Sequence, residues 1–348
     1  ATCVVFFPHL IAGPIVNYSE IMPQLRRPGW GVIRWNNLSV GLTIFIAGLA
    51  KKLFADHIAQ VSSPIFDLAA SGINLTFWEA WAAALGYTLQ LYLDFSGYCD
   101  MAIGLAWLFD VRLPMNFNSP YRATSIVDFW RRWHMTLSRF LRFYLYLPLR
   151  RLRSKESLSW KYVCLLLTML LGGLWHGAGW TFVVWGGIHG LLLVINHVFR
   201  DRFPDTAARL SATRWWTPVA WGLTFTSVVC AWVFFRAKNL ASATFILERM
   251  AGLRGISSDV LDGNAGLNTA DLVFMLAVTA ALIALPNIYQ VFAKESPITE
   301  LPKRLEPVRP AFRWRPAPVI GIAFGGIFFL FLQHFFAATP SEFLYFNF

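Results

Sequence analysis

The sequence contains few charged residues for its length. Asp, Glu, Lys and Arg together make up 14% of the 348 residues, whereas 56% are hydrophobic. A soluble domain carries about 25% charged residues. The composition therefore excludes a soluble protein and predicts an all-α integral membrane protein of roughly six to nine spans or partial spans, since each span needs about 20 apolar residues. Uncharged stretches occur at residues 35–50, 80–93, 162–199, 215–235, 272–293 and 316–341.

Several motifs of soluble and ATP-driven enzymes are also missing. The chain has no GxSxG nucleophile elbow, no Walker A loop, no HExxH zinc motif and no convincing dinucleotide fingerprint. A soluble hydrolase and an ATP-driven pump are therefore unsupported. Cys3, Cys99, Cys164 and Cys230 lie far apart without CxxC spacing, so we predict no metal site and no disulfide.

Acidic residues are almost absent from residues 112–155, where Asp128 alone opposes ten Lys and Arg residues. Under the positive-inside rule this basic segment lies in the cytoplasm, and it attracts anionic headgroups of membrane lipids. Because the segment is too charged to span and too apolar to float free, we expect helices that lie at the interface or dip into it. Nucleic acid is a poor alternative partner, because aromatic residues are threaded through the segment and membrane spans flank it.

The uncharged stretches also predict where helices begin and end. Residues 35–50 are expected to form a helix that ends at Lys51 and Lys52. Residues 162–199 are long enough for two spans joined by a glycine-rich turn at residues 177–179.

Two aspartates fall within the hydrophobic region at residues 78–109. We expect this region to be broken around Asp94 and Asp100. The two side chains could cap a broken helix, pair with a basic residue or line a polar cavity, and a structural pair is favoured.

Two histidines dominate the candidate chemistry. His176 lies inside an uncharged stretch, and His134 lies where the basic segment meets the membrane. An ionisable group at membrane depth is costly and therefore marks a functional site. Burial favours a neutral imidazole, which can accept a proton as a general base. We predict this role for His176, with His134 orienting the substrate or assisting, and His189 as a second candidate.

Structural explanations compete with these roles. His176 could be a buried histidine that is hydrogen-bonded to a backbone carbonyl, and His134 an interfacial histidine with its tip in water. Nearby glycines, Gly172, Gly173 and Gly177 among them, leave room for close helix approach or for a ligand.

Arginines of the basic segment are candidates for binding a phosphate-bearing donor. Arg131, Arg132, Arg139 and Arg142 are spaced so that several share one face of a helix. The guanidinium fork suits phosphate, so coenzyme A or phosphopantetheine would fit. Contact with lipid headgroups is an equally weighted alternative. Asn118, close to Pro120, has the character of a turn residue.

Taken in order, five motifs resemble the bacterial branch of the membrane-bound O-acyltransferase family. The aromatic tail at residues 342–348 resembles the ending of the alginate O-acetylation membrane proteins. The match covers most of the chain, and the combination is far more specific than any one piece. The motifs are residues 7–15, 94–102, 116–121, 129–134 and 173–177.

The resemblance implies a single multi-helix membrane domain over residues 1–348, with a funnel or tunnel and interfacial helices. It places the catalytic histidine at His176 and puts His134 where eukaryotic members often carry Asn. Family members usually have further N-terminal helices, and this chain begins at Ala1, so we expect N-terminal residues to be missing. The residues expected to bind donor or substrate are Arg131, Arg132, Trp133, Trp175 and Asn118.

The resemblance also implies an activity. We expect an acyltransferase of the bacterial inner membrane that takes an acetyl group from acetyl-CoA, with no tightly bound cofactor. The group would pass to a periplasmic partner acetyltransferase that modifies a polysaccharide such as alginate. In the teichoic-acid branch, a D-alanyl group comes from a carrier protein instead. Outside this class, the histidines could relay protons in a transporter, or the chain could be a noncatalytic scaffold.

Overall fold

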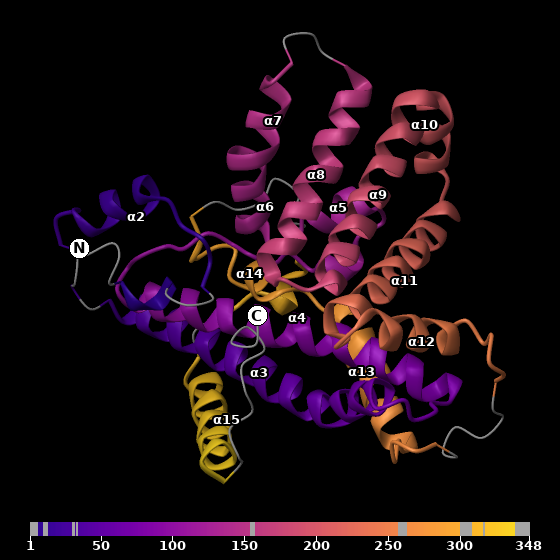
Figure 1. Ribbon diagram of the computed structural model, residues 1–348. Helices are drawn as coiled ribbons and strands as arrows, with labels where there is room; N and C mark the ends of the chain where they lie inside the picture. The colour runs from indigo at the N-terminus through magenta and orange to yellow at the C-terminus, as the bar shows by residue number, and fades with distance from the viewer. Residues whose placement is uncertain are drawn as a thin grey trace. The chain divides into compact units, whose positions relative to one another are not determined.

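The computed structural model describes residues 6–9, 13–29, 32, 34–153, 157–256, 263–299, 308–315 and 317–337. Their regular structure is helical, and in these ranges Leu113 and Ile298 form an isolated bridge without any strand (Figure 1). The prediction of an all-α membrane protein is confirmed. Two sequence features, the aromatic tail at 342–348 and Cys3, lie outside the described residues.

The chain forms two compact units. Unit 1 consists of residues 1–57, 90–118 and 284–347, and unit 2 contains residues 58–89 and 119–283. Two long helices contribute to both units, α3 (Trp35–Ala70) and α4 (Phe77–Leu108). Unit 1 also contains η1 (Phe7–His9), α2 (Tyr18–Leu25), α14 (Ile288–Val291), η4 (Pro310–Phe312) and α15 (Pro318–Ala337).

Unit 2 holds the basic segment and most of the remaining helices. The short elements are η2 (Pro120–Arg122), α5 (Ile126–Trp130), α6 (Met135–Leu141), a π-helical turn (Arg142–Tyr146) and α7 (Leu147–Arg151). The longer ones are α8 (Leu158–His176), α9 (Trp180–Arg202), α10 (Pro204–Ala212), α11 (Trp216–Arg236), α12 (Leu240–Met250) and α13 (Thr269–Ala284).

Within the described ranges, four helices are long and apolar enough to cross a membrane, namely α3, α8, α9 and α11. Two shorter apolar helices cover Thr269–Ala284 and Gly321–Gln333. The pair α8 and α9 confirms the prediction of two spans within residues 162–199, because the first ends at His176 and the second begins at Trp180. The chain is therefore a multi-pass membrane protein.

Two predicted helix boundaries are wrong. α3 continues through Lys51 and Lys52 to Ala70, and α4 is unbroken through Asp94 and Asp100. The cause is charge pairing between the two helices in unit 1. The Nζ atom of Lys51 lies 2.5 Å from Asp100 Oδ2, and that of Lys52 lies 3.0 Å from Asp94 Oδ1. The expected structural pairing of the aspartates is thus found, and it allows charged residues inside long helices.

The shared helix face expected for the arginines is contradicted for Arg131 and Arg132, whereas Arg139 and Arg142 lie three residues apart on continuous helix. α5 ends at Trp130 and α6 begins only at Met135, because His134 adopts a left-handed backbone conformation with φ 39°. Arg131 and Arg132 therefore do not belong to the helix that carries Arg139. The basic segment is folded as a series of short helices. That these helices lie at the membrane interface or dip into it stays a prediction.

Close contact between α8 and α9 depends on glycine. These helices lie side by side in unit 2 (Figure 1). A Cβ atom at Gly173 would overlap the backbone oxygen of Phe182, and one at Gly186 would overlap the backbone oxygen of Met169. The glycines thus let the backbones meet, as small residues do between membrane helices. This packing positions His176, which is the last residue of α8.

The variant Gly173→Leu is expected to lower the melting temperature of the purified protein markedly. Overpacking at such a contact costs about 1–3 kcal/mol or more, because the leucine displaces the α9 backbone. Gly222→Leu in α11 is the matched control, since no atom lies within 4 Å of a Cβ built there. Equal melting temperatures for the two variants would show that the close contact does not matter.

Candidate active site

His176 lies at the C-terminal end of α8 among aromatic side chains of unit 2. It is 8% exposed. Its ring centroid lies 5.1 Å from that of Phe235 and 5.4 Å from that of Trp185, with both partner rings turned edge-on. α11 supplies Phe235 and α9 supplies Trp185. The predicted base is thus held between three membrane helices, which restrict its ring and keep bulk water from it.

His134 is buried in the same unit and has an unusual backbone. Its side chain is 4% exposed, and its φ of 39° is uncommon for a residue with a Cβ atom. Such conformations cost about 1–3 kcal/mol and cluster at functional sites. Burial lowers the pKa of His134 well below its ordinary value, and the proximity of His176 lowers it further. The structure therefore brings the two predicted histidines together and keeps His134 neutral at pH 7.

His189 lies on α9 and is completely buried. Four aromatic rings surround it: Trp185 at 5.0 Å, Trp130 at 5.2 Å, and Phe129 and Trp232 at 6.0 Å between ring centroids. In the part of the chain that the structure describes, neither ring nitrogen of His189 has a hydrogen-bond partner. Leaving a buried polar group unpaired costs about 1–3 kcal/mol. A functional role for His189 stays a prediction, and its buried aromatic environment is compatible with such a role.

The aromatic shell contains residues that the sequence did not single out. Trp185 stacks on Trp232 with ring centroids 5.6 Å apart, and Phe235 contacts both. These side chains come from uncharged helical stretches with many other aromatic residues. The sequence signal was only the one-turn spacing of Trp232 and Phe235 on α11 and of Trp185 and His189 on α9. That spacing shows a shared helix face but not the partner that the face meets.

Two predicted donor-binding tryptophans have different environments. Trp133 is 4% exposed, stacks on Phe129 at 5.6 Å and contacts Trp232 at 5.0 Å between ring centroids. Trp175 is 56% exposed although its ring lies 5.4 Å from that of His176. Trp133 therefore belongs to the buried aromatic shell, whereas the side chain of Trp175 lies between His176 and the exposed surface of α8.

The other predicted donor-binding residues also differ from one another. Arg131 is exposed at the C-terminal end of α5. Arg132 is half-buried, and its Nε donates to Asp128 Oδ2 at 2.9 Å. Asn118 belongs to unit 1, where its Oδ1 accepts a hydrogen bond of 2.9 Å from Asn287. Donor binding by these three residues stays a prediction, and Arg131 has the more accessible guanidinium of the two arginines.

Acidification is expected to destabilise the protein through His134. Its folded-state pKa lies below that of the unfolded chain, near 6.5. Between these values the unfolded state binds more protons, so the stability present above pH 6.5 is lost as the pH falls. The loss from pH 7.5 to 5.5 should be about 1 kcal/mol smaller in His134→Gln than in the wild type. Melting temperatures of both proteins at the two pH values measure this difference, and equal losses would contradict a buried neutral His134.

The chain is similar in sequence to a known protein family and to several known proteins. The model of the membrane-bound O-acyltransferase family matches residues 2–244. A peptidoglycan O-acetyltransferase of Helicobacter pylori is 49% identical over 261 residues, which cover 74% of this chain and 47% of that protein. A probable alginate O-acetylase of Azotobacter vinelandii is 39% identical over 305 residues, covering 87% of this chain and 57% of that protein.

A more distant relative, the teichoic acid D-alanyltransferase of Bacillus subtilis, is 26% identical over 241 residues, covering 68% of this chain and 60% of that protein. The chain spans about half the length of these two curated O-acetylating relatives. The family model nevertheless covers the three buried histidines, His134, His176 and His189, and the aromatic shell around them. The chain therefore belongs to the membrane-bound O-acyltransferase family.

Proposed function

We propose that the protein transfers an acetyl group from a cytoplasmic thioester donor, acetyl-CoA in the first instance, toward an extracytoplasmic polysaccharide. The observation that carries this proposal is the burial of His134 and His176 together in unit 2. A neutral imidazole among aromatic rings is suited to take a proton from a hydroxyl group. Burial makes it less suited to hold a permanent charge.

The proposed reaction uses His176 as the general base. Its imidazole accepts the proton of the acceptor hydroxyl while the hydroxyl oxygen attacks the carbonyl carbon of the thioester. The tetrahedral intermediate collapses by breaking its carbon–sulfur bond, and the thiolate takes the proton back from the imidazolium. The products are an acyl ester and a free thiol. His134, whose pKa is lowered in part by the nearby His176, orients the acceptor or the base.

The relatives support an acetyl group over a D-alanyl group. The chain shares 49% and 39% identity with proteins named as peptidoglycan and alginate O-acetylating enzymes, and 26% with a D-alanyltransferase. Transfer of a D-alanyl group from a carrier protein to teichoic acid is therefore the second candidate. Acceptors of the polysaccharide class, a periplasmic partner acetyltransferase and a location in the bacterial inner membrane complete the proposal.

Thioester cleavage by the purified protein tests the donor. The protein in nanodiscs is incubated in parallel with acetyl-CoA carrying a labelled acetyl group and with D-alanyl carrier protein, and release of each free thiol is followed. We expect release from acetyl-CoA that increases when a soluble glycan acceptor is added. Release from the D-alanyl carrier alone would replace acetyl by D-alanyl transfer. Release from neither donor would favour the transporter or scaffold alternatives.

A further inference from the structure

An apolar groove runs along the first turns of α3 and α15 in unit 1, separate from the histidine site. Its volume is about 690 Å³, within the range of 300–1,000 Å³ that is common for small-molecule sites. The α3 wall includes Trp35, Leu42 and Ile46, and the α15 wall includes Phe324 and Phe328.

The polar side chains of the α3 wall do not make the groove hydrophilic. The hydroxyl of Ser39 donates to the backbone oxygen of Asn36 at 3.0 Å, and that of Thr43 donates to the backbone oxygen of Ser39 at 2.7 Å. Both hydroxyls are therefore satisfied within their own helix. What the groove offers to an occupant is hydrocarbon contact, which suits an acyl chain and not a sugar or a nucleotide.

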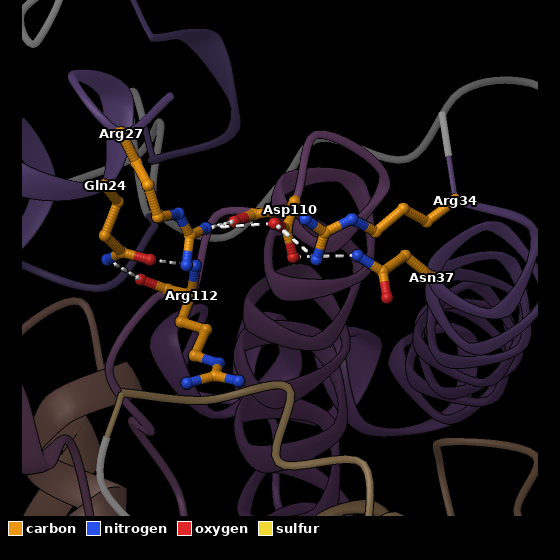
Figure 2. A network of polar contacts seen from close by, with 6 residues as sticks. All are labelled: Gln24, Arg27, Arg34, Asn37, Asp110 and Arg112. Atoms are coloured by element: carbon orange, nitrogen blue, oxygen red, sulfur yellow. Dashed lines mark hydrogen bonds and ion pairs between the residues drawn. The ribbon is translucent and has the colours of Figure 1, made fainter. Parts of the chain in front are cut away.

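One end of the groove is strongly basic. Arg315 lines the groove just before α15, and Arg34 directly precedes α3. Figure 2 shows Arg34 and Arg27 converging on the single carboxylate of Asp110, at 3.1 and 2.9 Å, with Asn37 donating to the same group.

Charge at this end of the groove is not balanced. Asp110 supplies one negative charge for Arg27 and Arg34, whose side chains are 48% and 55% exposed. Arg315 is exposed and has no ion-pair partner among the residues that the structure describes. The N-terminal ends of α3 and α15 add the positive ends of two helix dipoles. An anionic group with an apolar tail is complementary to both parts of the groove.

We propose that this groove binds one anionic phospholipid of the surrounding membrane. Its phosphate lies between Arg34 and Arg315, and an acyl chain follows the walls of α3 and α15 away from the arginines. A zwitterionic phospholipid carries no net charge, so it would not offset the excess positive charge. The arginine fork recognises phosphate geometry, and the held lipid would tie α15 to α3.

Lipid retention by the purified protein tests the headgroup end. The protein is extracted in mild detergent, and the phospholipids that remain bound are identified and counted by mass spectrometry. We expect the wild type to keep an anionic phospholipid, and the double variant Arg34→Gln/Arg315→Gln to keep about thirtyfold less, because each arginine contributes about a fivefold step. The control Arg209→Gln/Arg214→Gln removes the same charge from exposed positions of unit 2 and should retain the lipid.

A second pair of variants tests the apolar part. Gly325 lines the groove and Gly326 does not, and no atom lies within 4 Å of a Cβ built at either position. Gly325→Trp should therefore expel the lipid without disturbing a neighbour, whereas Gly326→Trp should keep it. The proposal is overturned if the double arginine variant retains as much lipid as the wild type, if zwitterionic lipid is kept equally well, or if a protein chain co-purifies in place of lipid.

Discussion

His176→Ala loses acyl transfer by about a thousandfold or more, the upper part of the range that general acid–base catalysis contributes. Alanine leaves no group to accept the proton of the acceptor hydroxyl. The rings of Phe235 and Trp185, which lie within 5.4 Å of the imidazole centroid, cannot take up a proton in its place. The measurement is the rate of acyl transfer to the glycan acceptor at saturating donor, compared with the wild type.

Two controls separate chemistry from folding. His57→Ala removes an exposed histidine of α3 and should leave the rate unchanged. His176→Gln retains a side chain of similar size that can donate and accept hydrogen bonds but cannot take up a proton at pH 7. It should keep the wild-type melting temperature and yet be as inactive as alanine. Wild-type rates in both His176 variants would show that the base lies elsewhere, with His189 the next residue to replace.

The candidate site could be predicted from sequence only in part. His176 stands out because an ionisable group within apolar sequence is expensive, and His134 because it lies where the basic segment meets the membrane. The proximity of the two histidines could not be predicted, because it depends on the left-handed turn at His134 and on the glycine contact between α8 and α9. Single-sequence patterns do not specify which helix faces meet. For the same reason, the shell of Trp185, Trp232 and Phe235 emerged only from the structure.

Helix boundaries were misjudged where charge lies inside a helix. Lys51 and Lys52 follow an uncharged stretch, which is the usual pattern at the end of a span. Each lysine instead meets an aspartate more than forty residues away on α4, so α3 continues. A local stretch of sequence contains only one of the two charged residues of each ion pair. The compensating partner becomes visible only when the two helices pack.

Lys51→Met is expected to destabilise the protein by about 3–5 kcal/mol, because it leaves a buried carboxylate without its cation. The Asp100 side chain is 2% exposed and that of Lys51 is 22% exposed. Among the residues that the structure describes, the other hydrogen bond to Asp100 comes from the hydroxyl of Tyr289, at 2.5 Å. A neutral phenol satisfies one oxygen but does not neutralise the charge. Thermal or denaturant unfolding in detergent would measure the loss.

Removing the orphaned charge should reverse most of this loss. In Lys51→Met/Asp100→Asn the amide oxygen still accepts from Tyr289, and no net charge remains buried. The double variant should therefore be more stable than Lys51→Met alone, although the second substitution, Asp100→Asn, also has an effect of its own on stability. As a matched control, Lys238→Met breaks a pair with Asp67 in which the side chains are 59% and 53% exposed. That change should cost less than about 1 kcal/mol. If Lys51→Met lowers the free energy of unfolding no more than Lys238→Met does, the Lys51–Asp100 ion pair is not what allows α3 and α4 to continue through their charged residues.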